Sequence, residues 1–187
     1  MVFSNKVVFR SAYRGSRHKF SLSAARGCVC GRNCEEVLAM NVLPVAARDR
    51  DAWLRMRAAL WPEESDVELG DEIDQYLDSS GTASLSAAFV SEDAAGKLTG
   101  FIELFLRNYA EGCVGVTPYV EGWYVDPDCR KEGIGRALMN AAETWARARG
   151  FTEIASDTTI DNELSQRAHR KSGFEEVERI VIYRKCL

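Results

Sequence analysis

A glycine-containing junction at residues 130–136, Arg-Lys-Glu-Gly-Ile-Gly-Arg, most constrains what this chain can fold into. An apolar run over 119–125 precedes it and an amphipathic pattern over 135–149 follows it, so the sequence predicts a strand, a turn and a helix in succession. The start of a helix carries unpaired N–H groups and a partial positive charge, and both favour anions. Two glycines allow close approach to the backbone, and three basic residues add charge. The junction therefore predicts a phosphate or pyrophosphate site.

Two common nucleotide-binding motifs fit this junction poorly. A P-loop has Lys followed by Ser or Thr after its last glycine, whereas Arg136 and Ala137 occupy those positions here. A dinucleotide fingerprint needs a small residue in place of Leu138, and an acidic residue at the end of the next strand. On this stretch alone, a second interpretation stays open, in which the glycines serve turn geometry and the basic residues are simply solvated.

Hydrophobic periodicity along the chain predicts an α/β fold with a mixed sheet. The predicted elements, in chain order, are a strand at 41–45, helices at 49–60 and 66–77, strands at 84–91, 98–108 and 119–125, a helix at 135–149, a strand at 153–157, a helix at 162–172 and a strand at 177–184. Strands and helices that alternate in this way within one chain indicate a single layered domain.

The first 39 residues differ in charge from the rest of the chain. Residues 1–39 hold seven basic and two acidic residues, whereas 40–187 carry a net charge of about −9. The leader is rich in Arg and Ser without sustained periodicity, so we expect a disordered extension. Met40 directly precedes the first folded pattern. The sequence therefore predicts one domain at 40–187; the leader is a targeting peptide or, as we favour, upstream sequence with no part in the chemistry.

Cysteine placement and hydropathy favour a cytoplasmic protein. Cys28, Cys30 and Cys34 crowd the leader and the other three cysteines are scattered, a pattern unlike a disulfide framework. The spacing of the leader cysteines is not a standard zinc pairing, so no metal site is expected. No apolar run approaches the roughly 18 residues that span a bilayer. Neither a membrane nor a nucleic acid is expected as a partner.

Two spaced motifs resemble those of the GCN5-related N-acetyltransferase (GNAT) family. "RKEGIGRAL" after "YVDP" is similar to the loop with which the family grips the pyrophosphate of acetyl-CoA, and "HRKSGF" is similar to the end of a later helix. The resemblance covers about residues 40–187 and implies a GNAT fold with splayed central strands and acetyl-CoA as co-substrate. The cofactor contacts that it implies are Trp123, Tyr124, Val125, Arg130, Lys131, Glu132, Gly133, Ile134, Gly135, Arg136 and Asn162.

Further stretches resemble one group within that family, the aminoglycoside 6′-N-acetyltransferases. They are "LWP" at 60–62, "RNYAEG" at 107–112, "VEGWYVDP" at 120–127, "ASDT" at 155–158, "DNELSQRAH" at 161–169 and "GFEEVERIVIYRK" at 173–185. The likeness implies a resistance enzyme that acetylates the 6′-amine of aminoglycoside antibiotics, and it implies a homodimer. A folded part with a net charge of about −9 suits a polycationic substrate.

The resemblance also implies roles for single residues. Glu121 matches a substrate contact and is our candidate to take the proton of the attacking amine, and Asp157 matches a carboxylate that binds substrate and relays that proton. His169 stands where the wider family often has a Tyr that protonates the leaving thiolate, and an imidazole can serve as that acid. The further substrate contacts that it implies are Trp61, Tyr109 and Glu178.

Plainer interpretations remain open for most of these residues. Glu121 and Glu178 could be solvated surface carboxylates, and Trp61 and Tyr109 could be packing residues. Asn162 could be a helix N-cap, and His169 could have a purely structural role.

The acceptor is a separate question, because a pyrophosphate loop does not discriminate among amines. A polyamine, a small metabolic amine or a protein N-terminus is the alternative enzyme substrate. A non-catalytic acyl-CoA sensor is the alternative of another class, although a sensor would not need several acids around the acetyl group.

Overall fold

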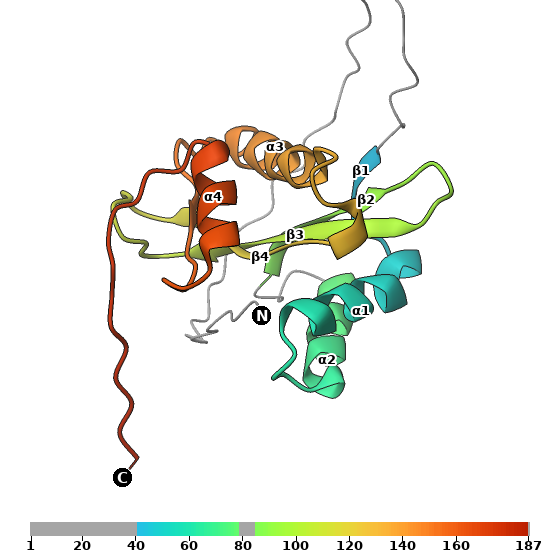
Figure 1. Cartoon of the computed structure of the whole chain (residues 1–187), viewed down its shortest axis with the longest axis horizontal. Coiled ribbons are helices and arrows are strands. Elements are labelled where there is room, and N and C mark those ends of the chain that lie inside the picture. Colours follow the sequence, from blue (N-terminus) through green and yellow to red (C-terminus); the bar gives the residue numbers. More distant parts are fainter. Residues whose placement is uncertain (1–40, 79–84, 187) are drawn as a thin grey trace, which may run out of the picture. The chain divides into compact units, whose positions relative to one another are not determined.

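The computed structural model describes residues 41–78 and 85–186, and within them the chain forms a mixed five-stranded sheet (Figure 1). The strand order is β1-β2-β3-β4-β5; the first four strands are antiparallel to their neighbours, and β5 runs parallel to β4. The strands are β1 (Asn41–Pro44), β2 (Leu85–Glu92), β3 (Leu98–Arg107), β4 (Thr117–Val125) and β5 (Ala155–Ser156). The mixed α/β fold predicted from the sequence is confirmed.

Helices cover both faces of this sheet. In Figure 1, α1 and α2 lie on one side of the strands and α3 on the other. The helices are α1 (Arg50–Leu60), α2 (Asp66–Leu77), α3 (Ile134–Arg147) and α4 (Glu163–Lys171), with short 3-10 turns η1 (Ala47–Asp49) and η2 (Pro127–Cys129). Within the described part of the chain, no helix is long and apolar enough to cross a membrane.

Each face of the sheet has its own apolar core. Trp53, Met56 and Leu69 of the first two helices pack on one face together with Phe101 of β3. On the other face, α3 packs through residues at helical spacing against β3 and β4. These α3 residues are Ile134, Leu138, Met139 and Ala142.

A buried ion pair ties the first core to the sheet. Arg57 of α1 is 1% exposed and its Nε lies 3.0 Å from Oε1 of Glu103 on β3, which is fully buried. The same guanidinium donates to Leu69 O at 2.9 Å and to Glu72 Oε2 at 2.6 Å. A buried charge persists only where it is paired and hydrogen-bonded, so this cluster fixes α1, α2 and β3 relative to one another.

Strand β4 contains a β-bulge at Glu121. Gly122 pairs with Glu103, and Val120 pairs with the very next residue of β3, so Glu121 is the extra residue between them. A bulge re-aims a side chain and bends its strand. On its other side β4 pairs with β5 at two positions, Tyr119 with Ala155 and Val120 with Ser156. The pairing of β4 with β5 therefore ends at Val120, immediately before the bulge, as expected for splayed central strands.

The prediction of a last strand at 177–184 is wrong. Residues 173–186 hold no strand and no helix in this structure. The pattern alternates as a strand would, but β5 spans two residues and offers little edge to pair with. The apolar side chains of the segment are consequently exposed: Val177, Ile180, Val181, Ile182 and Tyr183.

The other predicted elements exist with shifted bounds. The strand predicted at 153–157 is reduced to two residues, and α4 begins one residue later and ends one residue earlier than expected. Two predictions lie outside the described residues: the disordered leader at 1–39 and the start of the second strand at residue 84.

Candidate active site

The loop between β4 and α3 has the backbone geometry of an anion cradle. Gly133 caps α3 with φ at 89°, and Lys131 has φ at 76°. Lys131 is the one non-glycine residue with positive φ in the described part of the chain. An L-residue in that region is strained, and such strain gathers at ligand clamps. The loop is therefore held in a shape that its sequence alone would not prefer.

The start of α3 is open to an anion. Its N-cap has no side-chain hydrogen bond and its first turn has no acidic residue, so the positive end of the helix dipole is not neutralised from within. Arg130, Lys131 and Arg136 are exposed around it. A Cβ on Gly135 would lie 3.5 Å from the Trp123 ring. These features fit the diphosphate of acetyl-CoA, since they supply N–H donors, charge and a bare backbone.

Strand β4 and the helix start are tied together by Trp123. Its indole Nε1 donates to Gly135 O at 3.1 Å, and its ring meets that of His169 edge-on with centroids 5.4 Å apart. Tyr124 points to the opposite face, where it stacks on Phe101. The predicted cofactor contacts of Trp123, Tyr124 and Val125 would therefore be made by main-chain groups.

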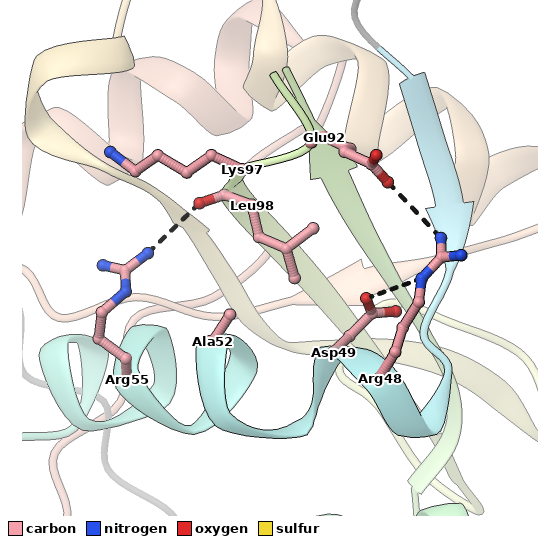
Figure 2. A pocket seen from close by; sticks show the side chains of 8 residues that line it. Arg48, Asp49, Ala52, Arg55, Glu92, Lys97 and Leu98 are labelled. Atoms are coloured by element: carbon pink, nitrogen blue, oxygen red, sulfur yellow. Dashed lines mark hydrogen bonds and ion pairs between the residues drawn. The ribbon is translucent and has the colours of Figure 1, made fainter. Parts of the chain in front are cut away.

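The base of the loop is fastened to α1. Arg55 donates to both carboxylate oxygens of Asp126, at 2.9 and 3.0 Å, and the carboxylate is mostly buried. This hydrogen bonding raises the pKa of Arg55. Arg55 also donates to Leu98 O, at 3.4 Å, beside a surface pocket of about 490 Å³ (Figure 2). In the loop itself, Arg130 Nε donates to Val125 O at 3.0 Å.

Glu121 is paired with an arginine that the sequence did not single out. Arg107, the last residue of β3, donates through Nε to Glu121 Oε1 at 2.8 Å and bonds the same oxygen through Nη2. The guanidinium carbon lies 3.5 Å from the centroid of the Tyr119 ring. The Glu121 side chain is 11% exposed. The candidate base is therefore held in place by a cation that itself stacks on an aromatic ring.

Asp157 belongs to the same cluster. Burial raises the pKa of the Tyr119 hydroxyl, and the charge and hydrogen bond of Asp157 raise it further. Asp157 therefore lies beside the hydroxyl of Tyr119, and the ring of Tyr119 packs against Arg107, the partner of Glu121. The structure brings together the two carboxylates that the sequence had placed 36 residues apart.

His169 of α4 is half-buried and faces Trp123 of β4 and Ser156 of β5. Its Nδ1 lies 2.8 Å from Ser165 O, and its Nε2 lies 2.9 Å from Ser156 Oγ. The ring also meets Phe174 edge-on at 5.2 Å. Burial lowers the pKa of His169 below its ordinary value of 6.5, against smaller raising effects of Ser165 O and Asp157.

The remaining predicted contacts fall into different environments. Asn162 accepts from Ser165 N at 3.1 Å and is thus the N-cap of α4, as its plainer interpretation held. Trp61 is 3% exposed and packs beside Phe101 in the core. Tyr109 is 70% exposed, and Glu178 lies on the exposed segment after α4. Their contacts with substrate stay predictions.

Residues that the sequence reading missed lie next to those it found. Arg107, Ser156 and the pair of Arg55 with Asp126 all contact a predicted element, yet each partner is far away in sequence. The sequence offered a signal for two of them only, since Arg107 lies in the "RNYAEG" stretch and Ser156 in the "ASDT" stretch of the family resemblance. No group of three or more His, Cys, Asp or Glu side chains that could hold a metal occurs among the described residues.

A strand–loop–helix anion cradle beside a splayed sheet defines an acyl-CoA-dependent acyltransferase, and a family model agrees. Residues 50–174 match the acetyltransferase (GNAT) family, and the chain belongs to that family. An aminoglycoside N(6′)-acetyltransferase type 1 from Klebsiella aerogenes is 44% identical over 147 residues, which are 78% of this chain and 96% of the relative. The predicted resemblance to that group is confirmed.

Solved structures agree in fold. AAC(6′)-Iy in complex with the bisubstrate analogue CoA-S-monomethyl-acetylneamine superposes with a TM-score of 0.71 at 31% identity, covering 79% of this chain and 99% of that one. A structure of AAC(6′)-Iy with CoA gives a TM-score of 0.73 at 30% identity, covering 82% and 99%.

Proposed function

We propose that this protein transfers the acetyl group of acetyl-CoA to the 6′-amine of aminoglycoside antibiotics and so confers resistance to them. The observation that carries this proposal is the cluster of Glu121, Arg107, Tyr119 and Asp157 where β4 and β5 part. It offers carboxylates to a cationic amine at the point toward which the loop before α3 would direct an acyl group. The likeness to enzymes named for this reaction supports it.

Acetyl-CoA is held, in this proposal, by the loop before α3. The diphosphate is bound by the N–H groups at the start of the helix and by three exposed cations, Arg130, Lys131 and Arg136. Glu132, Gly133, Ile134 and Gly135 shape the loop. The acyl arm pairs with the main chain of residues 123–125 as an added strand would. Asn162 contacts the cofactor in addition to capping α4.

The reaction needs a neutral amine. At pH near 7 the substrate's ammonium must lose a proton before its nitrogen attacks the thioester carbonyl; the C–N bond then forms, the C–S bond breaks and the thiolate takes up a proton. Glu121 accepts the amine's proton directly or through water, with Asp157 as the relay. Backbone N–H groups of β4 next to the bulge stabilise the oxyanion.

His169 supplies the proton to the leaving thiolate. Burial lowers its pKa, so the imidazole rests neutral at pH 7 and must first receive a proton from the amine side. His169 in this way passes the proton released by the amine on to the thiolate, so the cycle needs no other acid.

Three residues complete the substrate site. Tyr109, which is 70% exposed, lies on the loop after β3, and Glu178 lies in the exposed segment after α4. Both reach the substrate from the rim. Trp61 is buried, so it supports the drug site from below by packing against Gly122 of β4, where an added Cβ would come within 2.9 Å of its ring.

The acceptor is tested by release of free CoA thiol from acetyl-CoA. The panel contains kanamycin, tobramycin, spermidine and peptides with a free N-terminus. We expect turnover with the aminoglycosides only. If spermidine or the peptides alone gave turnover, the aminoglycoside proposal would be abandoned; if no amine did, a sensor role would be favoured.

We further propose a homodimer in which the segment after α4 takes part. Its exposed apolar residues alternate as in a strand, and an unpaired strand edge is a template for another chain. Light scattering after size exclusion should give twice the chain mass of 20.9 kDa. Val181→Lys should shift the mass toward the monomer, and a monomeric wild type would contradict the idea.

The catalytic domain, in our proposal, comprises residues 40–187 and works in the cytoplasm. The described cysteines Cys113, Cys129 and Cys186 are unpaired, which suits a reducing compartment. A chain that starts at Met40 should keep the KM for both substrates. Loss of activity in that shortened chain would give residues 1–39 a catalytic role, and recovery of the enzyme outside the cytoplasm would contradict the location.

A further inference from the structure

A continuous chain of short contacts links α4 to β4 through His169. Nδ1 of the imidazole lies 2.8 Å from Ser165 O, Nε2 lies 2.9 Å from Ser156 Oγ, and Ser156 Oγ lies 3.1 Å from Val120 O. Val120 and Ser156 are also the last pair of β4 and β5 before these strands part. The chain of contacts therefore ends at the splay, next to the bulged Glu121.

Counting hydrogens shows that these three contacts cannot all be hydrogen bonds while His169 is neutral. Each contact needs one hydrogen, but a neutral imidazole carries one N–H and Ser156 carries one O–H. Because Nδ1 faces a carbonyl oxygen at 2.8 Å, it holds the imidazole's hydrogen. Ser156 then donates to Nε2, and the contact with Val120 O is left without a hydrogen.

A third hydrogen arrives when His169 is protonated. Nε2–H then donates to Ser156 Oγ, and the hydroxyl turns to donate to Val120 O. All three contacts are satisfied, and one of them becomes a charge-assisted bond, which is the stronger kind. The change requires only that the hydroxyl hydrogen of Ser156 rotates, and no heavy atom has to move.

We propose that Ser156 is a positioning residue that makes His169 a two-state proton carrier for acetyl transfer, by accepting from its protonated form and donating to its neutral form. The inference rests on the proposed function, in which His169 delivers a proton to the thiolate. Ser156 itself neither gains nor loses a proton over the cycle. The proton comes from the amine, rests on Nε2 and leaves for sulfur by way of the Ser156 hydroxyl, which gives up one hydrogen for each that it takes, because Ser156 Oγ occupies the one in-plane site of Nε2.

The other groups that face the imidazole do not duplicate this role. Trp123 of β4 and Phe174 after α4 present rings to it. Asp157 is the charged group among those that act on it, and its effect on the pKa is the smallest of the three causes. Ser165 Oγ lies 3.3 Å from Nδ1, the nitrogen that already donates to a carbonyl.

Direct titration of His169 tests the proposal independently of activity. The chain has two histidines, so His18→Gln leaves one imidazole, whose Cε1–H signal reports its pKa by NMR. We compare this parent with Ser156→Ala and, as a matched control at the other nitrogen, Ser165→Ala. A hydrogen bond to a charged group contributes enough that Ser156→Ala should lower the pKa by about one unit, and Ser165→Ala should lower it less.

Ser156→Thr keeps a hydroxyl and should leave the pKa of His169 near that of the parent. If Ser156→Ala does not fold, Ser156→Cys takes its place, because a weak thiol donor should give a smaller fall in the same direction. An unchanged pKa in the folded Ala or Cys variant, or a larger fall in Ser165→Ala, overturns the proposal.

Measurement of turnover distinguishes a failure of this proposal from a failure of the proposed function on which it rests. A fall of one unit in the pKa is a tenfold loss of imidazolium, so kcat of Ser156→Ala should fall by about tenfold while KM for acetyl-CoA stays unchanged. If the pKa falls and kcat does not, the hydrogen-bond device stands and the role of His169 in catalysis is wrong. If neither changes, the device itself is wrong.

Discussion

Arg55 and Asp126 form a two-bonded ion pair that fastens the end of β4 to helix α1, with nitrogen–oxygen distances of 2.9 and 3.0 Å. The residues that follow Asp126 are the 3-10 turn and the loop that caps α3. The same helix carries a second pair of the same type, in which Arg50 donates to both oxygens of Asp74 at 2.6 and 2.7 Å. That pair joins α1 to α2 and makes no bond to the end of β4.

The two pairs give a matched test of the loop. Arg55→Ala should raise KM for acetyl-CoA by about tenfold, because the loop loses the contact that fixes its base. Arg50→Ala removes an equivalent pair from the same helix and should leave this KM unchanged. Initial rates with acetyl-CoA varied at saturating kanamycin, together with thermal unfolding of both variants, measure the difference.

Two results would argue against the role of Arg55. Equal KM values in Arg55→Ala and Arg50→Ala would mean that the pair stabilises the fold and nothing more. The double variant Arg55→Asp with Asp126→Arg exchanges the two charges. If it does not recover part of the affinity for acetyl-CoA, the charge pairing itself is not what positions the loop.

The carboxylates Glu121 and Asp157 should govern turnover. We expect Glu121→Gln and Asp157→Asn to lower kcat for kanamycin by at least about a hundredfold, since a proton acceptor is lost, with little change in the Kd of CoA. Glu163→Gln, which removes an exposed carboxylate paired with Arg167, is the control and should behave as wild type. Steady-state rates and calorimetric CoA titration give the two quantities; undiminished kcat in either variant removes that residue from the mechanism.

Gly135 should be intolerant of a side chain for a reason of space. An added Cβ would be in ordinary van der Waals contact with the Trp123 ring, at 3.5 Å, so the two further methyl groups of Gly135→Val would crowd that ring and cover the first turn of α3. We expect the Kd of CoA to rise by tenfold or more, about 1.4 kcal/mol. Gly150→Ala, which strains the left-handed backbone just beyond the end of α3, is the control for general destabilisation of that helix. CoA binding that survives Gly135→Val would place the diphosphate somewhere else.

The depressed pKa of His169 predicts a pH dependence of stability. Because the folded state binds this proton less readily than the unfolded chain, whose imidazole has the ordinary pKa of 6.5, unfolding becomes easier as pH falls below about 6.5. The stabilisation is fully present above that pH. Urea unfolding at pH 5.5 and 7.5 should show a larger loss for wild type than for His169→Gln, and equal losses would contradict the burial of a neutral imidazole.

The loop between β4 and α3 is the part of the site that the sequence predicts best. The order of an apolar strand, glycines, cations and an amphipathic helix is local information, and it predicted the junction from β4 to α3 and the cradle around Gly133 and Gly135. The left-handed backbone of Lys131 was not foreseeable, because Lys has no preference for that conformation. The segment at 177–184 shows the opposite failure, since its alternation is a local pattern but a strand exists only where another strand pairs with it.

By itself, the sequence determined every element except the last predicted strand, their order, and the glycines and cations gathered at the loop, because helix starts, turns and hydrophobic faces depend on neighbours along the chain. The tertiary structure alone decided which side chains meet: Glu121 with Arg107, Asp157 with Tyr119, and His169 with Ser156. A bulge in β4 and the short pairing of β5 bring these side chains together. Strand register and burial are properties of the packed sheet, and no local pattern encodes them.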